Sequence, residues 1–163
     1  MSEDFDTINV IIEIPRGSRN KYEYDHDTHR IYLDRVLYSS VHYPTDYGFV
    51  PHTLSPDGDP LDVLVIIEEP TFPGCEMKVR PIGLLVMRDE AGVDEKVLAV
   101  PVAAPRLEQV QELSDVGEHW LREIENFFDT YKLLEGKETK VEKWLGAEAA
   151  REALRKYQVD QDK

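Results

Sequence analysis

The residues best suited to do chemistry in this sequence lie in one hexapeptide, Asp57-Gly58-Asp59-Pro60-Leu61-Asp62. Carboxylates this close together repel one another and resist burial, so clustering them is favourable only if cations lie between them. If the segment is extended, Asp57 and Asp59 point to the same side, because side chains alternate along a strand. Hard oxygen ligands at the start of a buried strand suit Mg²⁺ or Mn²⁺. The alternative is an acidic surface turn between two strands, which is the commoner case for an isolated pair of aspartates.

Further carboxylates lie where strands are expected to end. Glu13 comes late in the predicted first strand, and Asp89 and Asp94 flank the turn of a predicted hairpin, where they can face each other. A solvated carboxylate at a strand end accounts for any one of them taken alone. Taken jointly with the hexapeptide, these positions predict one acidic pocket.

Basic and phenolic side chains are interleaved with the acids. Lys21 and Glu23 share one face of a strand, as do Asp94 and Lys96, because the side-chain period of a strand is two. The other members of this group are Arg35, Tyr43, Tyr47, Tyr131 and Lys132. A surface ion pair or a core aromatic would explain each of them alone. A phosphate site, however, needs carboxylates to hold divalent metals and Arg, Lys and Tyr donors for the remaining phosphate oxygens.

The bulk composition narrows the class of protein. A chain of 163 residues predicts a single domain (1–163, with a core at about 8–157), and the net charge of −14 argues against nucleic acid or an anionic membrane as a partner. No apolar run reaches the roughly 18 residues that span a bilayer. The start, Met1–Asp6, is acidic where a signal peptide would be basic, and the single cysteine, Cys75, fits a reducing cytoplasm.

The elements that must position these residues change in type along the chain. The first two-thirds reads as short strands and turns, which predicts a mainly β, α+β fold with a small closed antiparallel barrel. Within it, residues 62–67 and 79–87 are apolar almost throughout, so both faces of these strands should be covered. The last third has helical spacing at residues 115–136 and 147–157, with Asp115 and Glu118 resembling a capping box. The tail after Tyr157 is polar and is expected to fray.

In this order, the motifs resemble those of the family I soluble inorganic pyrophosphatases in their short bacterial form, from about Val10 to Trp144. The strongest match is Asp57–Val63, which follows the family signature D-x-D-P-x-D-x. The supporting segments are Ile12–Pro15, Lys21–Glu23, Asp34-Arg35, Tyr43–Gly48, Asp89–Gly92 with Asp94 and Lys96, and Phe127-Phe128 before Tyr131-Lys132.

The resemblance implies a barrel related to the OB-fold, flanked by two or three helices, and an Mg²⁺-dependent hydrolysis of pyrophosphate to two phosphates. It also implies a homohexamer in the cytoplasm. Mn²⁺ is the substitute metal that the oxygen ligands themselves suggest. The implied metal ligands are Glu13, Asp57, Asp62, Asp89 and Asp94, and the implied phosphate ligands are Lys21, Arg35, Tyr47, Lys96, Tyr131 and Lys132. Asp59 would accept the proton of the nucleophile, with Asp94 as the alternative. Glu23 and Tyr43 would support the site.

Two other functions remain open at this point. An OB-like barrel could bind single-stranded nucleic acid, but such grooves are basic and this chain is strongly acidic. A protein that only binds divalent ions could use the same carboxylates, but it has no use for Lys21, Arg35, Lys96 and Lys132. Release of phosphate from pyrophosphate, with and without Mg²⁺, separates these functions from the enzyme.

Overall fold

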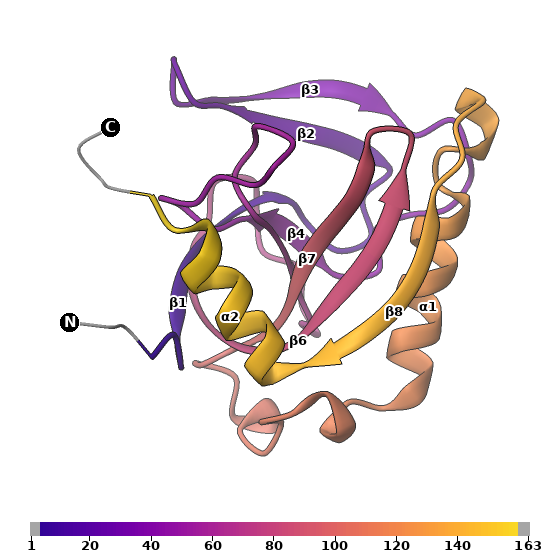
Figure 1. Cartoon of the computed structure of the whole chain (residues 1–163). Coiled ribbons are helices and arrows are strands. Elements are labelled where there is room, and N and C mark those ends of the chain that lie inside the picture. Colours follow the sequence, from indigo (N-terminus) through magenta and orange to yellow (C-terminus); the bar gives the residue numbers. More distant parts are fainter. Residues whose placement is uncertain (1–3, 160–163) are drawn as a thin grey trace.

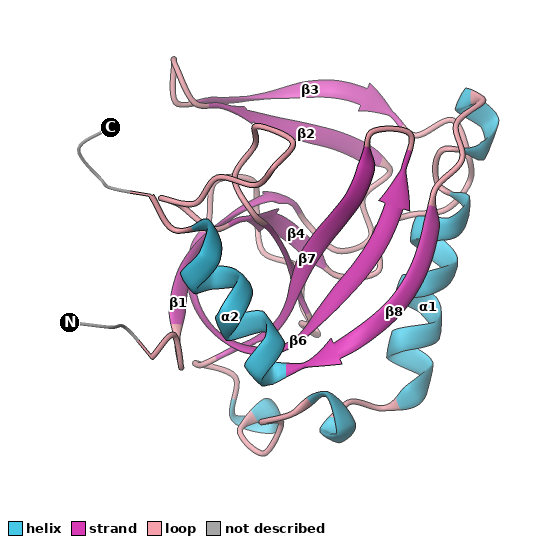
Figure 2. Ribbon diagram, in the orientation of Figure 1, coloured by secondary structure: helices cyan, strands magenta, loops and turns pink. Residues whose placement is uncertain are grey.

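The computed structural model of the chain describes residues 4–159 and is mainly β, with helices on two sides of the strands (Figures 1 and 2). The strands are β1 (Ile8–Ile14), β2 (Asn20–Asp25), β3 (Arg30–Val36), β4 (Asp46–Phe49), β5 (Asp62–Val65), β6 (Glu76–Asp89), β7 (Gly92–Pro101) and β8 (Lys140–Gly146). The α-helices are α1 (Glu118–Thr130) and α2 (Ala147–Tyr157), and the short 3-10 helices are η1 (Pro105–Leu107), η2 (Leu113–Asp115) and η3 (Leu133–Glu135). The mainly β class is thereby confirmed.

Five strands are paired in a ring. The sheet order is β1-β4-β5-β7-β6-β8, and β1 pairs antiparallel with β6 as well as with β4. The single parallel pairing in this ring joins β5 to β7 and sets Asp62 beside Lys96. Strands β2 and β3 form a separate hairpin, drawn above the ring in Figure 1. The ring and the hairpin together bring distant parts of the sequence to one end of the molecule.

The apolar run that includes β5 is covered on both faces, as predicted. Val63 and Val65 belong to one core cluster, which α2 completes, whereas Leu64 and Ile66 belong to a second cluster, which α1 completes. All four side chains are at most 3% exposed. Alternate residues of this run therefore pack into two different clusters, each of which includes a helix, and this packing fixes the strand that begins at Asp62.

Glycine is required in β4 because this strand lies very close to β1. A Cβ atom at Gly48 would lie 1.9 Å from the carbonyl oxygen of Ile11. Without a side chain at this position the strands can approach, and the neighbouring residue Tyr47 pairs with Ile14 of β1 and Leu64 of β5. The absence of a side chain at Gly48 thus allows the close approach of β4 to β1 that positions Tyr47.

The hexapeptide is a turn, the alternative to an extended segment, because the Asp57 side chain accepts a hydrogen bond from the Asp59 N–H (2.9 Å) and Gly58 has φ +92°. The predicted start of the second hairpin strand was wrong. Strand β7 begins at Gly92, so Asp94 is its third residue and pairs with Met87 rather than starting the strand. A positive φ of 122° at Gly92 permits the shorter turn.

The predicted helix start was also misplaced. Asp115 ends η2, where its side chain accepts hydrogen bonds from the N–H groups of Gln111 and Glu112, and α1 begins only at Glu118. The tail does not fray immediately after α2, since Gln158 forms a β-bridge with Thr53; residues 160–163 lie outside the described part. None of the helices within residues 4–159 has the length and apolar character needed to cross a membrane.

Candidate active site

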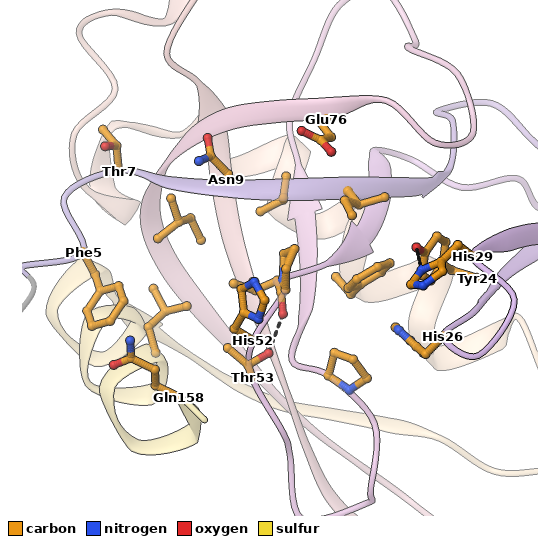
Figure 3. A pocket seen from close by; sticks show the side chains of 18 residues that line it. Phe5, Thr7, Asn9, Tyr24, His26, His29, His52, Thr53, Glu76 and Gln158 are labelled. Carbon is orange, nitrogen blue, oxygen red and sulfur yellow. Dashed lines mark hydrogen bonds between the residues drawn. The ribbon is translucent and has the colours of Figure 1, made fainter. Parts of the chain in front are cut away.

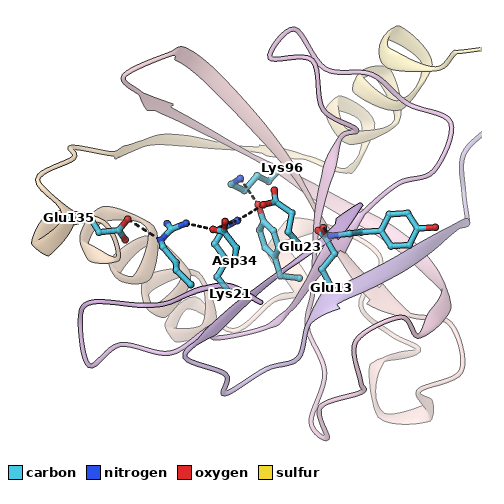
Figure 4. Close-up of polar contacts among 9 residues, drawn as sticks. Glu13, Lys21, Glu23, Asp34, Lys96 and Glu135 are labelled. Atoms are coloured by element: carbon cyan, nitrogen blue, oxygen red, sulfur yellow. Dashed lines mark hydrogen bonds and ion pairs between the residues drawn. The ribbon is translucent and has the colours of Figure 1, made fainter. Parts of the chain in front are cut away.

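The centre of the candidate site is the ammonium group of Lys96 on β7 (Figure 4). It lies 2.9 Å from a carboxylate oxygen of Asp62 and 2.9 Å from one of Asp94, and it donates a hydrogen bond of 2.9 Å to the Tyr47 hydroxyl. Lys96 is 3% exposed. Burial lowers its pKa, but the charges of Asp62 and Asp94 outweigh burial and hold the pKa well above the ordinary lysine value. Lys96 therefore remains charged and is a strong donor toward the oxygens around it.

An aromatic wall lies behind this lysine. The rings of Tyr47 and Phe128 have their centroids 5.2 Å and 5.3 Å from the Lys96 ammonium. Tyr43 is 2% exposed and packs against Tyr47 and Phe127, so it is a core residue that supports the wall. Burial raises the pKa of Tyr43, Tyr47 and Tyr131, and it raises that of Tyr131 to about 12. Their hydroxyls are therefore neutral donors at ordinary pH.

Glu13 on β1 is a buried carboxylate close to the same centre. Its side chain accepts a hydrogen bond of 2.9 Å from the Tyr24 N–H, which ties β1 to the β2–β3 hairpin. Burial raises the pKa of Glu13 to about 7; the Tyr24 hydrogen bond lowers it, and the charges of Asp62 and Glu23 raise it further. A carboxylate in this state is stabilised by any additional positive charge placed nearby.

The raised pKa of Glu13 predicts a pH dependence of stability in metal-free buffer. The folded form keeps its proton up to about pH 7, whereas the unfolded form loses it near pH 4.5. The folded state therefore binds more protons between these values, and its free energy of unfolding should fall by about 3 kcal/mol as pH rises through this window. Urea titrations at pH 4.5 and pH 7.5 measure this difference in the free energy of unfolding, which Glu13→Gln should abolish. The same substitution at exposed Glu138 is the control. An equal dependence of the unfolding free energy on pH in both variants would contradict the prediction.

The hexapeptide brings Asp57, Asp59 and Asp62 to the edge of this group. Asp62 starts β5, and the loop before it is fastened by the Thr53 hydroxyl, which accepts a hydrogen bond from the Leu61 N–H (2.9 Å). Asp59 is exposed at the surface, but partial burial of its carboxyl raises its pKa, and the charges of Asp57 and Asp62 raise it further. Asp59 is thus a better proton acceptor than an isolated aspartate.

The β6–β7 hairpin contributes Asp89 and Asp94. Both line a cavity of about 510 Å³ together with Asp57. Burial raises the pKa of Asp94, and although Lys96 lowers it, the charges of Asp62 and Asp89 add to the increase. The cavity therefore joins the hexapeptide to the hairpin, although its lining includes only three of the acids predicted to share one pocket, Asp57, Asp89 and Asp94.

The β2–β3 hairpin adds the cations. Lys21 and Arg35 are register partners on the two strands, and like charges in opposite positions repel. Asp34 separates them: its carboxylate lies 2.7 Å from an Arg35 nitrogen and 3.5 Å from the Lys21 ammonium. Glu23 lies 3.5 Å from Lys21, as its place on the same strand face predicted (Figure 4). The sequence motif contained Asp34, but no role for it was predicted.

Lys132 lies between α1 and η3. Burial lowers its pKa, and the charges of Glu90 and Asp89 oppose this change. Lys132 is therefore near the β6–β7 hairpin, and Glu90 is a second acidic neighbour that sequence reasoning missed. Glu135, whose carboxylate lies 3.0 Å from Arg35, is a third. Nothing in the local pattern marks these two acids, because their partners are distant in the sequence.

The donor atoms fit a hard divalent cation in their chemistry. All the converging acids are carboxylates, and Asp57, Asp62 and Asp89 each raise the pKa of a neighbouring acid, a repulsion that a divalent cation would relieve. Within residues 4–159, however, no three His, Cys, Asp or Glu side chains are grouped closely enough to hold one ion, and Lys96 stands between Asp62 and Asp94. The residues thus have the chemistry of a Mg²⁺ or Mn²⁺ site without surrounding a single point.

A larger cavity, of about 800 Å³, lies elsewhere (Figure 3). Its lining includes His26, His29 and His52, together with residues of β1 and of the end of α2. None of the predicted site residues lines it. Tyr24 and His29 are joined there by a hydrogen bond of 2.8 Å. Size alone therefore does not identify the site; the chemistry is concentrated around Lys96.

Comparisons with known proteins agree with this assignment. The family model described as inorganic pyrophosphatase matches residues 10–161. A protein of Leifsonia xyli named inorganic pyrophosphatase is 55% identical over 143 residues, which cover 87% of this chain and 88% of the relative. One of the same name from a Nostoc species is 59% identical over 137 residues, which cover 84% of this chain and 81% of the relative.

Solved structures give the same result. The crystal structure of inorganic pyrophosphatase from Thermus thermophilus has a TM-score of 0.91 at 47% identity, covering 95% of this chain and 91% of that one. The structure of an inorganic pyrophosphatase from Coxiella burnetii has a TM-score of 0.92 at 46% identity, covering 96% and 95%. On its sequence and its fold, this chain belongs to the family I inorganic pyrophosphatases.

Proposed function

We propose that this chain is an inorganic diphosphatase, which hydrolyses pyrophosphate to two phosphates with a divalent metal, Mg²⁺ or in its place Mn²⁺. Its family membership supports this reaction. The observation that carries the proposal is the position of one buried lysine between two carboxylates and a tyrosine, with further acids and cations around it. Such a mixture of charges suits a polyanion that arrives with cations.

The metal ligands we propose are Asp57, Asp62 and Asp94, together with Glu13, Asp89 and again Asp94 for the ions that accompany the substrate. Mutual repulsion among these carboxylates supports the assignment, since a bound cation relieves it. When bound, the divalent ions neutralise charge and lower the pKa of water.

The donors we propose for the phosphate oxygens are Lys21, Arg35, Tyr47, Lys96, Tyr131 and Lys132, with Glu23 and Tyr43 in support. Lys96 remains charged despite its burial, and the tyrosines remain neutral, so each offers a proton to an anionic oxygen. Asp59 accepts a proton from the attacking water, and its raised pKa supports this role. Asp94 is the alternative acceptor.

Three finer properties belong to the same proposal. The ring of strands is taken as a closed, OB-like barrel, which the pairing of β1 with both β4 and β6 supports. The chain is taken as one domain over residues 1–163 that acts in the cytoplasm as a homohexamer. Exposed apolar side chains, such as Phe72 (63% exposed) and Leu134 (69%), offer surface for contacts between subunits. Sedimentation velocity tests the assembly.

Phosphate release from pyrophosphate is the direct test. With Mg²⁺, the purified chain should release two phosphates for each pyrophosphate consumed, and EDTA should abolish turnover. Mn²⁺ added after EDTA should restore part of it. A chain that binds Mg²⁺ but releases no phosphate would be a divalent-ion binder, and the proposed reaction would be wrong.

Arg35→Lys should lower kcat/KM for pyrophosphate about tenfold, because a point charge cannot replace the planar fork of the guanidinium. The fork contacts Asp34 and Glu135 at the same time, and lysine reaches only one of them. Arg122→Lys, in an exposed ion pair of α1, is the matched control. An unchanged kcat/KM for Arg35→Lys would argue against a substrate contact at this position.

A further inference from the structure

The turn after α1 exposes two apolar side chains and buries a charged one. Within η3, Leu133 and Leu134 are 53% and 69% exposed, whereas the side chain of Glu135 is 9% exposed. Burying a carboxylate while two leucines face solvent is unfavourable unless the carboxylate has a partner of opposite charge. Within a single chain, hydrophobic burial therefore does not account for the conformation of this turn, whereas the ion pair of Glu135 contributes to it.

That partner is Arg35 of β3. A carboxylate oxygen of Glu135 lies 3.0 Å from the Nε atom of Arg35 (Figure 4). Nε has no hydrogen-bond partner within residues 4–159, so this contact is an ion pair and not a directed hydrogen bond. The other oxygen of Glu135 is buried and likewise lacks a partner there. The charge of Glu135, more than its hydrogen-bonding geometry, therefore acts on Arg35.

Asp34 and Glu135 hold the guanidinium at two of its nitrogens. Asp34 accepts a hydrogen bond of 2.7 Å from Nη1, and Glu135 pairs with Nε. The contacts within the described residues leave the remaining nitrogen, Nη2, without a protein partner. Two carboxylates thus fix the plane of the guanidinium while one edge stays available for another anion.

The backbone couples Glu135 to a second cation of the site. The Glu135 N–H donates a hydrogen bond of 3.0 Å to the carbonyl of Lys132, and so does the Lys137 N–H at 3.2 Å. Gly136, at φ +77°, allows the chain to close this turn. One short turn consequently carries Lys132 itself and the acid that contacts Arg35.

We infer that Glu135 is a positioning residue, which uses its negative charge to fix Arg35 for contact with a phosphate group of pyrophosphate. This inference rests on the proposed function. It assigns Glu135 no contact with substrate, since Glu135 acts through Arg35. If it is right, the loss caused by removing the charge of Glu135 must depend on the presence of Arg35.

The test is a double-mutant cycle on the full-length chain with Mg²⁺ present. Glu135→Gln, which keeps the size of the side chain, should lower kcat/KM about tenfold when Arg35 is present and less than about twofold in an Arg35→Ala background. Glu118→Gln, in an exposed ion pair of α1, should change neither background. Equal losses in both backgrounds, or no loss in either, would overturn the inference.

Thermal unfolding separates a positioning role of Glu135 from a purely structural one, because the two roles predict opposite changes in the unfolding midpoint. Arg35→Ala leaves the buried carboxylate of Glu135 unpaired, so adding Glu135→Gln to that variant should raise its unfolding midpoint. A purely structural requirement for Glu135 predicts a further decrease, which would overturn the inference.

Calorimetric titration with imidodiphosphate, a pyrophosphate analogue with a P–N–P bridge, separates this inference from the proposed function. If the unchanged chain failed to hydrolyse pyrophosphate, the proposed function would be wrong. Glu135→Gln should still weaken binding of the analogue only when Arg35 is present. Weakening that is independent of Arg35 would overturn the inference by itself.

Discussion

Asp59→Asn should reduce kcat for pyrophosphate by a factor on the order of 10² to 10⁴, the range expected on losing a general base, while the fold stays intact. Asparagine keeps the shape of the side chain and cannot accept the proton. Asp59 is exposed, and its backbone holds the turn together: its carbonyl accepts a hydrogen bond of 2.7 Å from the Ser55 N–H. The substitution leaves that bond in place, so the unfolding midpoint should change little.

Two comparisons make this result specific. Asp27→Asn, the same change in another exposed turn, should leave kcat unaffected. Asp94→Asn should lower both activity and stability, because Asp94 is paired with buried Lys96 at 2.9 Å. Stopped assays of phosphate release and thermal melts on the three variants distinguish the two candidate bases. If Asp59→Asn kept nearly full turnover, Asp59 would not be the proton acceptor and Asp94 would take its place.

Short-range patterns in the sequence predicted the strands well, and they placed some neighbouring residues of the candidate site correctly. A period of two placed Asp94 and Lys96 on one face, and the structure has them 2.9 Å apart. The continuous apolar run from Val63 to Ile66 predicted two covered faces, since no solvent-facing row of polar residues interrupts it. Such patterns succeed because they depend on geometry within one element.

The features that the sequence did not predict depend on hydrogen bonds and ion pairs that form only in the folded chain. The Asp57 side chain accepts a hydrogen bond from the backbone of Asp59, which favours a turn over an extended segment. Glu135 was missed because its partner, Arg35, lies in a distant hairpin that only the folded chain brings near. For a similar reason the sequence predicted Lys96 as a phosphate donor but not as the ion that bridges Asp62 and Asp94.

Lys96→Met should have the largest effect on the electrostatics of the site. Without metal, it leaves Asp62 and Asp94 facing each other with no positive charge between them, and the free energy of unfolding should fall by about 3 kcal/mol. Magnesium should then stabilise this variant more than it stabilises the unchanged chain, because the lysine no longer competes for the two carboxylates. Activity should nevertheless fall at least about tenfold, since a proposed phosphate donor is lost.

The prediction combines a gain in stabilisation by Mg²⁺ with a loss of activity, and the two are measured separately. Unfolding midpoints with EDTA and with Mg²⁺ give the stabilisation by metal, and phosphate release at saturating Mg²⁺ gives the activity. Lys143→Met, an exposed lysine of β8, is the control for losing a positive charge. If Mg²⁺ stabilised Lys96→Met less than it stabilises the unchanged chain, Asp62 and Asp94 would not share a cation. The lysine would then neutralise an acidic pair that serves the fold alone.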